Sequence, residues 1–99
     1  MFYVLYSFEV LPGKTDDFLK GWRGMTELIR DYEGGLGSRL HKVDDIRYVA
    51  YAHWPDRVTW ESSGDKLPAE SDDYRQLMRG SCEKIETMES MYMIDDLLV

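Results

Sequence analysis

A turn at Pro12-Gly13 separates two patterns that belong to different kinds of secondary structure. Residues 2–10, before the turn, are dense in aromatic and β-branched side chains, which is typical of a strand. After the turn, apolar residues recur at steps of three or four, and these are Phe18, Trp22, Met25, Ile29 and Tyr32. This spacing places them on one stripe of a helix of about five turns. The chain therefore begins with a strand and a long amphipathic helix.

The helix is predicted to start with Thr15 as its N-cap and to end at Gly34-Gly35, because glycine readily adopts the left-handed conformation that commonly ends a helix. The further predicted elements are strands over 36–42 and 47–54, a short helix capped by Asp56, a helix from Ser71 to Gly80 and a strand over 86–94. The order β-α-β-β-α-β predicts an α+β ferredoxin-like sandwich, with both helices on one face of a four-stranded antiparallel sheet. A length of 99 residues fits one domain, 1–99.

Both faces of the predicted strands are apolar, although the helices can cover only one face. In the first strand, one face carries Phe2, Val4, Tyr6 and Phe8, and the other carries Tyr3 and Leu5. In the last strand, Met88, Tyr92 and Ile94 oppose Met91 and Met93. The second face needs another sheet to cover it, and a second copy of the chain is the simplest source. We therefore expect a homodimer that pairs sheet to sheet as a dimeric α+β barrel.

Charge, hydropathy and cysteine content exclude several kinds of partner and site. Nineteen acidic residues against twelve basic residues give a net charge of −7, which argues against nucleic acid or an anionic membrane surface as a partner. No apolar run approaches the roughly 20 residues that span a bilayer. Cys82 is the single cysteine, and no cluster of Cys and His residues has metal-ligand spacing. We expect a soluble cytoplasmic protein with no metal site.

Five short motifs follow one another along the chain. They are Val10-Leu11-Pro12-Gly13-Lys14, then Phe18 and Trp22, then Gly34-Gly35-Leu36-Gly37-Ser38, then Tyr51-Ala52-His53-Trp54-Pro55-Asp56, and finally Trp60-Glu61. With these motifs the chain resembles the antibiotic biosynthesis monooxygenase superfamily over nearly its whole length. The resemblance implies a ferredoxin-like dimer, a pocket within each protomer between sheet and helices, and cofactor-independent oxidation of polycyclic aromatic or quinol-like substrates. In one branch of the superfamily the activity is oxidative haem breakdown.

Cofactor-free oxygenation needs an apolar aromatic cavity and a polar group that takes or holds a proton. The candidates for the proton are His53, Tyr6 and Tyr74. The candidates for substrate contact are Trp22, Tyr51, Trp54, Trp60 and Met78. For each of them packing in the core or the dimer interface is the competing interpretation. The loop over 62–68 is predicted to be either a lid beside the pocket or a plain connector.

The sequence departs from the haem-degrading branch at its functional positions. Tyr6 stands where that branch has an asparagine, and Met78 stands where it has the haem-ligating histidine. Neither residue performs the same task, so no haem is expected. The glycines over 34–37 follow a helix and open a strand, the reverse of the order in a dinucleotide site, so no flavin or other cofactor is expected either. We predict a cofactor-independent monooxygenase that oxidises a small aromatic or quinol-like molecule with O₂. The alternative is a non-catalytic dimer that binds a small apolar ligand.

Overall fold

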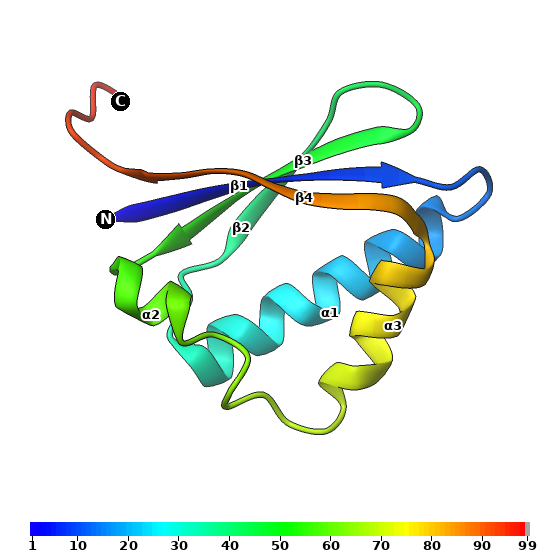
Figure 1. Cartoon of the computed structure of the whole chain (residues 1–99), viewed down its shortest axis with the longest axis horizontal. Coiled ribbons are helices and arrows are strands. Elements are labelled where there is room, and N and C mark those ends of the chain that lie inside the picture. Colours follow the sequence, from blue (N-terminus) through cyan, green and yellow to red (C-terminus); the bar gives the residue numbers. More distant parts are fainter. Residues whose placement is uncertain (99) are drawn as a thin grey trace.

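The computed structural model describes residues 1–98 as a four-stranded antiparallel sheet and three helices (Figure 1). In chain order the elements are β1 (Phe2–Val10), α1 (Thr15–Glu33), β2 (Ser38–Lys42), β3 (Arg47–Trp54), α2 (Arg57–Glu61), α3 (Ser71–Gly80) and β4 (Cys82–Tyr92). The order and the antiparallel sheet confirm the predicted ferredoxin-like α+β fold.

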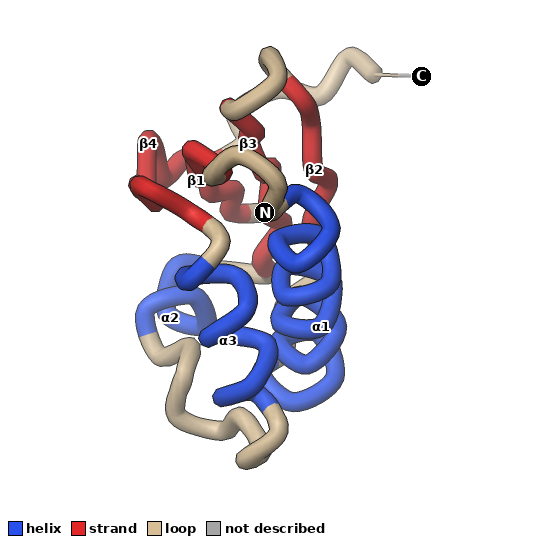
Figure 2. The backbone as a smooth tube through the Cα atoms, turned by 90° about the vertical axis from the view of Figure 1, so that its right-hand side faces the viewer, coloured by secondary structure: helices blue, strands red, loops and turns tan. Residues whose placement is uncertain are grey.

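The helices and the strands form two layers. The strand order is β2-β3-β1-β4, and the helices of residues 1–98 all lie on the same side of the sheet (Figure 2). We call that side the helix face; its β1 and β3 residues include Phe2, Val4, Tyr6, Phe8, Ala50, Ala52 and Trp54. The opposite side, which we call the open face, includes Tyr3, Tyr51 and His53. The two faces follow from the alternation of side chains along a strand.

Strand register decides which side chains meet on the helix face. Tyr6 lies opposite Ala50, and Ala52 lies between Val4 on one side and Ser38 on the other. The pairing of β1 with β4 shifts where Leu5 opposes Glu89 and Tyr6 opposes Thr87, so Met88 is left out of the ladder as a bulge. Because of this bulge, the regular alternation that was predicted to put Met88 on one face with Tyr92 and Ile94 does not hold, and Ile94 lies beyond the end of β4.

The buried stripe of α1 packs the helix against the sheet and α3. Phe18, Met25 and Leu28 are buried on this stripe, whereas Tyr32, which the spacing also placed there, is 51% exposed. The two helices approach most closely at Gly21, where a Cβ atom would lie 2.5 Å from the backbone nitrogen of Met78. A side chain at this position would therefore force the backbones of α1 and α3 apart.

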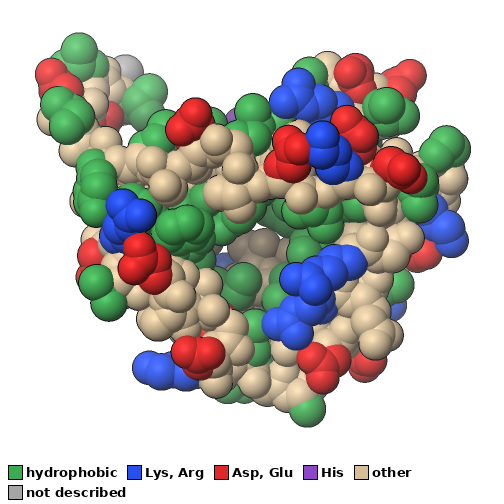
Figure 3. Space-filling model, in the orientation of Figure 1, with side chains coloured by type: hydrophobic (Ala, Val, Ile, Leu, Met, Phe, Trp, Pro, Cys, Tyr) green, Lys and Arg blue, Asp and Glu red, His purple; other side chains and the backbone are tan. Residues whose placement is uncertain are grey.

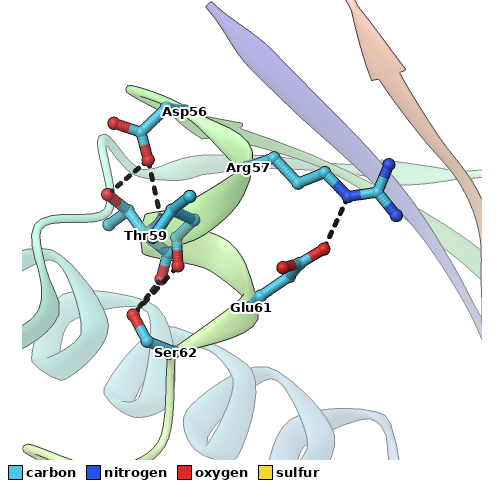
Figure 4. Close-up of polar contacts among 6 residues, drawn as sticks. Asp56, Arg57, Thr59, Glu61 and Ser62 are labelled. Carbon is cyan, nitrogen blue, oxygen red and sulfur yellow. Dashed lines mark hydrogen bonds and ion pairs between the residues drawn. The ribbon is translucent and has the colours of Figure 1, made fainter.

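Helix α2 is short and is fixed by contacts at its own ends (Figure 4). The Asp56 carboxylate accepts hydrogen bonds from the backbone nitrogen and the hydroxyl of Thr59, each at 2.7 Å, which confirms the predicted cap. These bonds hold the pKa of the Asp56 carboxyl below its ordinary value. Arg57 donates to Glu61 at 2.6 Å one turn later. Through this helix the chain turns back beneath β1 and presents Trp60 to it.

Some predicted boundaries were wrong. Thr15 is the first helical residue and not the N-cap, which is Lys14, and no side chain caps that end. Strand β2 begins at Ser38 and not at residue 36, after Gly37 with a φ of 100°. Strand β4 begins at Cys82, four residues earlier than predicted, because the charged segment after Cys82 forms an exposed edge strand. Of the predicted tail, residues 95–98 lie outside the strands, and Val99 lies outside the described residues.

Candidate functional site

A cavity of about 520 Å³ lies between the helix face of the sheet and the helices. Figure 3 shows it as a hollow with apolar side chains inside and basic side chains along one rim. The lining comes from four strands, two helices and the segment before β2, and consists of Tyr6, Phe8, Trp22, Met25, Thr26, Ile29, Gly35, Gly37, Ser38, Ala50, Ala52, His53, Trp54, Met78, Arg79, Ile85 and Thr87. Its volume lies within the roughly 300–1,000 Å³ range of small-molecule sites.

Small residues of the sheet leave the space for this cavity. The buried core consists of two clusters, one around Phe8 and Phe18 and the other around Phe2 and Trp54. Tyr6 packs against both clusters. On β3, Ala50 belongs to the first cluster and Ala52 to the second, and both line the cavity. Larger apolar residues there would fill the gap, so the cavity is a consequence of the β3 sequence.

Tyr6 places a hydroxyl group in the cavity wall. Its hydroxyl oxygen accepts a hydrogen bond from Trp60 Nε1 at 2.8 Å. Because the indole can only donate, the Tyr6 O–H hydrogen is free to be donated elsewhere. Burial raises the pKa of Tyr6, against the smaller opposing effect of the Trp60 hydrogen bond. The phenol is therefore protonated at neutral pH and serves as a hydrogen-bond donor.

Arg79 is the one Lys, Arg, Asp or Glu side chain in the lining of this cavity. It lies near the end of α3, is exposed, and makes no ion pair within residues 1–98. One turn earlier on the same helix, Arg75 pairs with Asp72 at 3.2 Å. The protein carries a net charge of −7, yet this cavity has at its rim a cation that makes no ion pair within residues 1–98. An anionic group on a ligand would find a partner there.

Five of the eight predicted site residues line the cavity, and they are Tyr6, Trp22, His53, Trp54 and Met78. Trp60 is outside the lining but donates a hydrogen bond to Tyr6. The other two predicted residues lie away from the cavity. Tyr51 lies on the open face because it alternates with Ala50 and Ala52 along β3. Tyr74 packs against Gly24 in a shallow groove between α1 and α3, on the far side of those helices.

His53 borders the cavity, but its ring belongs to the open face. The ring packs edge-on against Tyr3 at 4.7 Å and against Tyr51 at 4.9 Å, and the two tyrosines stack on each other at 5.0 Å. Burial lowers the pKa of His53, and the nearby charge of Arg39 lowers it further. The imidazole is therefore neutral near pH 7, and it cannot act as a base towards a ligand held against Tyr6 without leaving this aromatic cluster.

The loop over 62–68 contributes nothing to the cavity lining. It is fastened instead to the end of α1, where one carboxylate oxygen of Glu33 accepts hydrogen bonds from the backbone nitrogens of Gly64 and Lys66. The predicted lid is thus placed away from the cavity wall, and the connector interpretation fits its position. A sequence pattern of glycine, serine and proline reports a loop but not which surface the loop crosses.

Ser38 and Arg79 are among the lining residues that the sequence analysis did not name for the site. Ser38 enters the cavity because it opposes Ala52 in the β2–β3 register, and Arg79 enters it because α3 ends beside β4. Neither relation has a local sequence signal, since both depend on tertiary packing. Among residues 1–98, no group of three or more His, Cys, Asp or Glu side chains is arranged to hold a metal ion. In the same range, no helix has the length and apolar character needed to cross a membrane.

Comparison with known proteins relates this arrangement to a family. A comparison with curated proteins found no significant match. Among solved structures, SnoaB from Streptomyces nogalater, described as a cofactor-independent oxygenase, superposes with a TM-score of 0.78 at 14% identity, covering 97% of this chain and 95% of that chain. Rv0793 from Mycobacterium tuberculosis gives a TM-score of 0.74 at 13% identity, covering 98% of each chain. These similarities show the shared fold.

The sequence itself matches a family model. The match covers residues 1–65, from β1 through α2, and the model is that of the antibiotic biosynthesis monooxygenase domain. This segment contains Tyr6, Trp22, Trp54 and Trp60, and it contributes most of the cavity wall. The chain therefore belongs to the antibiotic biosynthesis monooxygenase family.

Proposed function

We propose that this protein is a cofactor-independent monooxygenase that oxidises a small aromatic or quinol-like substrate with O₂ in the cavity between sheet and helices. The observation that carries the proposal is the Tyr6 hydroxyl, which accepts a hydrogen bond from Trp60 inside a mostly apolar, aromatic cavity. Membership of the family supports an oxygenase activity, and SnoaB, with the same fold, is described as a cofactor-independent oxygenase.

The substrate must itself become electron-rich, because no cofactor supplies the electrons in this proposal. A phenolic substrate does so when it loses its proton. Arg79 at the rim favours the resulting phenolate by charge attraction, and the proton leaves to solvent at that exposed end of the cavity. The apolar walls around Trp22 and Phe8 exclude water from the ring of the bound anion.

The phenolate then reduces O₂, and a carbon–oxygen bond forms to give a hydroperoxide on the substrate. The Tyr6 O–H is free to donate to the peroxide oxygen that departs, because its own oxygen is already the acceptor for Trp60. One oxygen atom of O₂ stays on the substrate as a carbonyl and the other leaves as water with hydrogens from the substrate. The substrate therefore supplies all the electrons, and no external reductant is needed.

Oxidation of 1,5-dihydroxynaphthalene to juglone and water tests the proposal, since this conversion has the stoichiometry just described. We expect enzyme-dependent O₂ uptake, and isotope from labelled O₂ should appear in juglone. Tyr6→Phe should lower kcat by about a hundredfold, the usual size of a lost proton donor. Tyr32→Phe, at an exposed tyrosine of α1, is the matched control and should leave turnover unchanged. No uptake with this or other dihydroxynaphthalenes would contradict the proposal.

A non-catalytic ligand-binding role is the second candidate, and one observation favours it. The ring of His53, the histidine bordering the cavity, packs on the open face and not against Tyr6, so that histidine supplies no base to the bound ligand. Saturable binding of 1,5-dihydroxynaphthalene without O₂ uptake would favour this role. Uptake that saturates with the same concentration dependence as binding would favour the enzyme.

We also propose that two copies pair through their open faces. Leu5, Val49, Tyr51 and Met91 are only partly buried on a face that no helix in residues 1–98 covers. A partner sheet would remove this apolar surface from water and complete a barrel. The homodimer, the cytoplasmic location and the lack of a cofactor all stay predictions from the sequence.

A further inference from the structure

The open face carries an aromatic cluster of Tyr3, Tyr51 and His53, and His53 is the member that titrates near neutral pH. Its ring packs edge-on against Tyr3 of β1 at 4.7 Å and against Tyr51 of its own strand at 4.9 Å. The Nε2 atom is buried and has no hydrogen-bond partner within residues 1–98. A protonated imidazole carries an N–H on both nitrogens, so the charged form would leave this nitrogen with a buried, unpaired donor.

Charged groups from β2 and from the segment after β4 lie beside the cluster. The pocket that His53 lines on this face is also lined by Arg39, Asp95 and Asp96. None of these three makes an ion pair within residues 1–98. Burial lowers the pKa of His53, and the charge of Arg39 lowers it further. The two carboxylates therefore do not outweigh burial and Arg39, and the neutral ring is the favoured form in one protomer.

The rest of the open face holds the second histidine of the sequence and further carboxylates. His41 is exposed near the end of β2, and alternation places it on the same face as Arg39. Glu9 of β1 and Glu89 of β4 also lie on this face. These carboxylates, and the net charge of −7 on each copy, repel a second copy less strongly as the pH falls. General electrostatics therefore predicts tighter association in acid, so a weaker association points to a histidine.

We propose that protonation of His53 dissociates the sheet-to-sheet dimer, which makes this imidazole a pH-sensitive switch of the association state. The inference rests on the proposed pairing through the open faces, and it adds the group that controls the pairing. A partner sheet would exclude water from a ring that is half-buried in one protomer. The imidazolium is then more costly in the dimer than in the separated copies, because it loses its remaining hydration and gains no acceptor within its own chain.

The direction of the effect follows from proton linkage. Because the charged ring is most disfavoured in the dimer, protons bind the separated copies more tightly than the dimer. The dimer is therefore tightest above about pH 6.5, and its dissociation constant rises as the pH falls through the pKa of the separated copies, which lies below that ordinary value. Each dimer contains two His53 rings, and both contribute to the rise.

Sedimentation velocity over a concentration series at about pH 7.5 and about pH 5.5 measures the dissociation constants. Relative to a variant without the imidazole, we expect the constant of the parent to rise by about tenfold between these values, which corresponds to about 1.4 kcal/mol. His53→Phe keeps a ring against Tyr3 and Tyr51 and removes the titrating group, so it should lack this rise. His53→Asn is a second variant with the same expectation. Circular dichroism at both pH values checks that every protein remains folded.

The matched control is His41→Asn, which removes the other histidine of the open face and should keep the full rise. The proton affinity of the imidazole provides a second readout. An NMR titration of the imidazole protons, with His53→Asn identifying the signal, measures the pKa of His53 at protein concentrations above and below the dissociation constant. We expect a lower pKa in the dimer than in the separated copies, because the same linkage acts in both directions.

A stable dimer whose response to acid is the same in the parent and in both His53 variants would overturn the switch and leave the pairing proposal standing. A rise that His41→Asn abolishes, or a pKa of His53 that does not change with association, would do the same. A chain that stays monomeric at both pH values over the whole concentration series would overturn the pairing proposal and the switch with it.

Discussion

The two faces of the sheet consist of alternating residues of the same strands, yet one face leaves a cavity and the other is closely packed. On the helix face, β3 presents alanines, and a cavity remains beneath α1 and α3. On the open face, the same strand presents Tyr51 and His53, which pack tightly with Tyr3. The comparison shows that side-chain size, alternating with a period of two, separates a face with a cavity from a face whose aromatic side chains pack closely together.

The largest expected effect is on the open face. Tyr51→Asp places a carboxylate where the proposed partner sheet packs. Met91→Asp does the same on β4, where Met91 pairs with Tyr3 of β1. An unpaired buried carboxylate costs about 3 kcal/mol or more, so the dimer dissociation constant should rise by more than about a hundredfold. Sedimentation velocity over a concentration series measures it.

The control for this prediction is Val58→Asp, which puts the same charge on an exposed position of α2 beneath the helix face. It should leave the association state unchanged. If both open-face variants stay dimeric at the parent's concentration, the partner surface lies elsewhere.

The next effect is on the packing beneath the helix face. Gly21→Ala adds a Cβ atom that would lie 2.5 Å from the Met78 nitrogen and 2.7 Å from the Tyr74 carbonyl oxygen. We expect the free energy of unfolding to fall by about 1–3 kcal/mol, the usual cost of overpacking. Urea denaturation measures it. Gly80→Ala, where the added Cβ meets nothing within 4 Å, should be neutral or slightly stabilising.

A smaller effect concerns charge at the cavity rim. Arg79→Gln should weaken binding of 2-naphthoate by about tenfold at low salt and leave the uncharged 2-naphthamide unaffected. Arg75→Gln is the matched control, because Arg75 lies one turn earlier and already pairs with Asp72. Calorimetric titration at two salt concentrations measures the difference. Equal losses of naphthoate affinity in the two variants would show that Arg79 acts only through the overall positive charge of α3, without a specific contact to the ligand.

The smallest effect is a pH dependence that belongs to the open face. The pKa of His53 is lowered in the folded chain from its ordinary 6.5, so the unfolded chain takes up a proton more readily. The contribution of this histidine to stability is therefore complete above about pH 6.5 and is lost as the pH falls through the folded pKa.

Urea denaturation between pH 7.5 and about pH 5 should show this loss in the parent and a flatter profile in His53→Asn. His41→Asn, at an exposed histidine of β2, serves as the control. A steeper acid loss in His53→Asn than in the parent would contradict the assignment.

The sequence predicted the fold far better than the site, and particular residues show why. Local periodicity is sufficient to find α1 and the strands, because each element repeats its own pattern over many residues. The cavity depends on which residues of different elements meet. Alternation along β1 correctly put Tyr6 on the same face as Phe8, but nothing local indicates that Ser38 opposes Ala52 or that Arg79 reaches the cavity rim. Tyr74 was predicted to lie in the site, but its ring packs against Gly24 on the outer side of α1, where the glycine has no side chain to exclude it.

The position of β4 at the edge of the sheet affects how this protein avoids aggregation. An unpaired edge is a template for another strand, and β4 is eleven residues long and mostly exposed. Its first half alternates charges, with Lys84 and Glu86 paired at 2.6 Å, and the bulge at Met88 interrupts its ladder. Both features oppose the addition of a further strand. Growth of the sheet beyond β4 into a fibre is thereby disfavoured, whereas the proposed pairing through the open faces closes on itself after two copies.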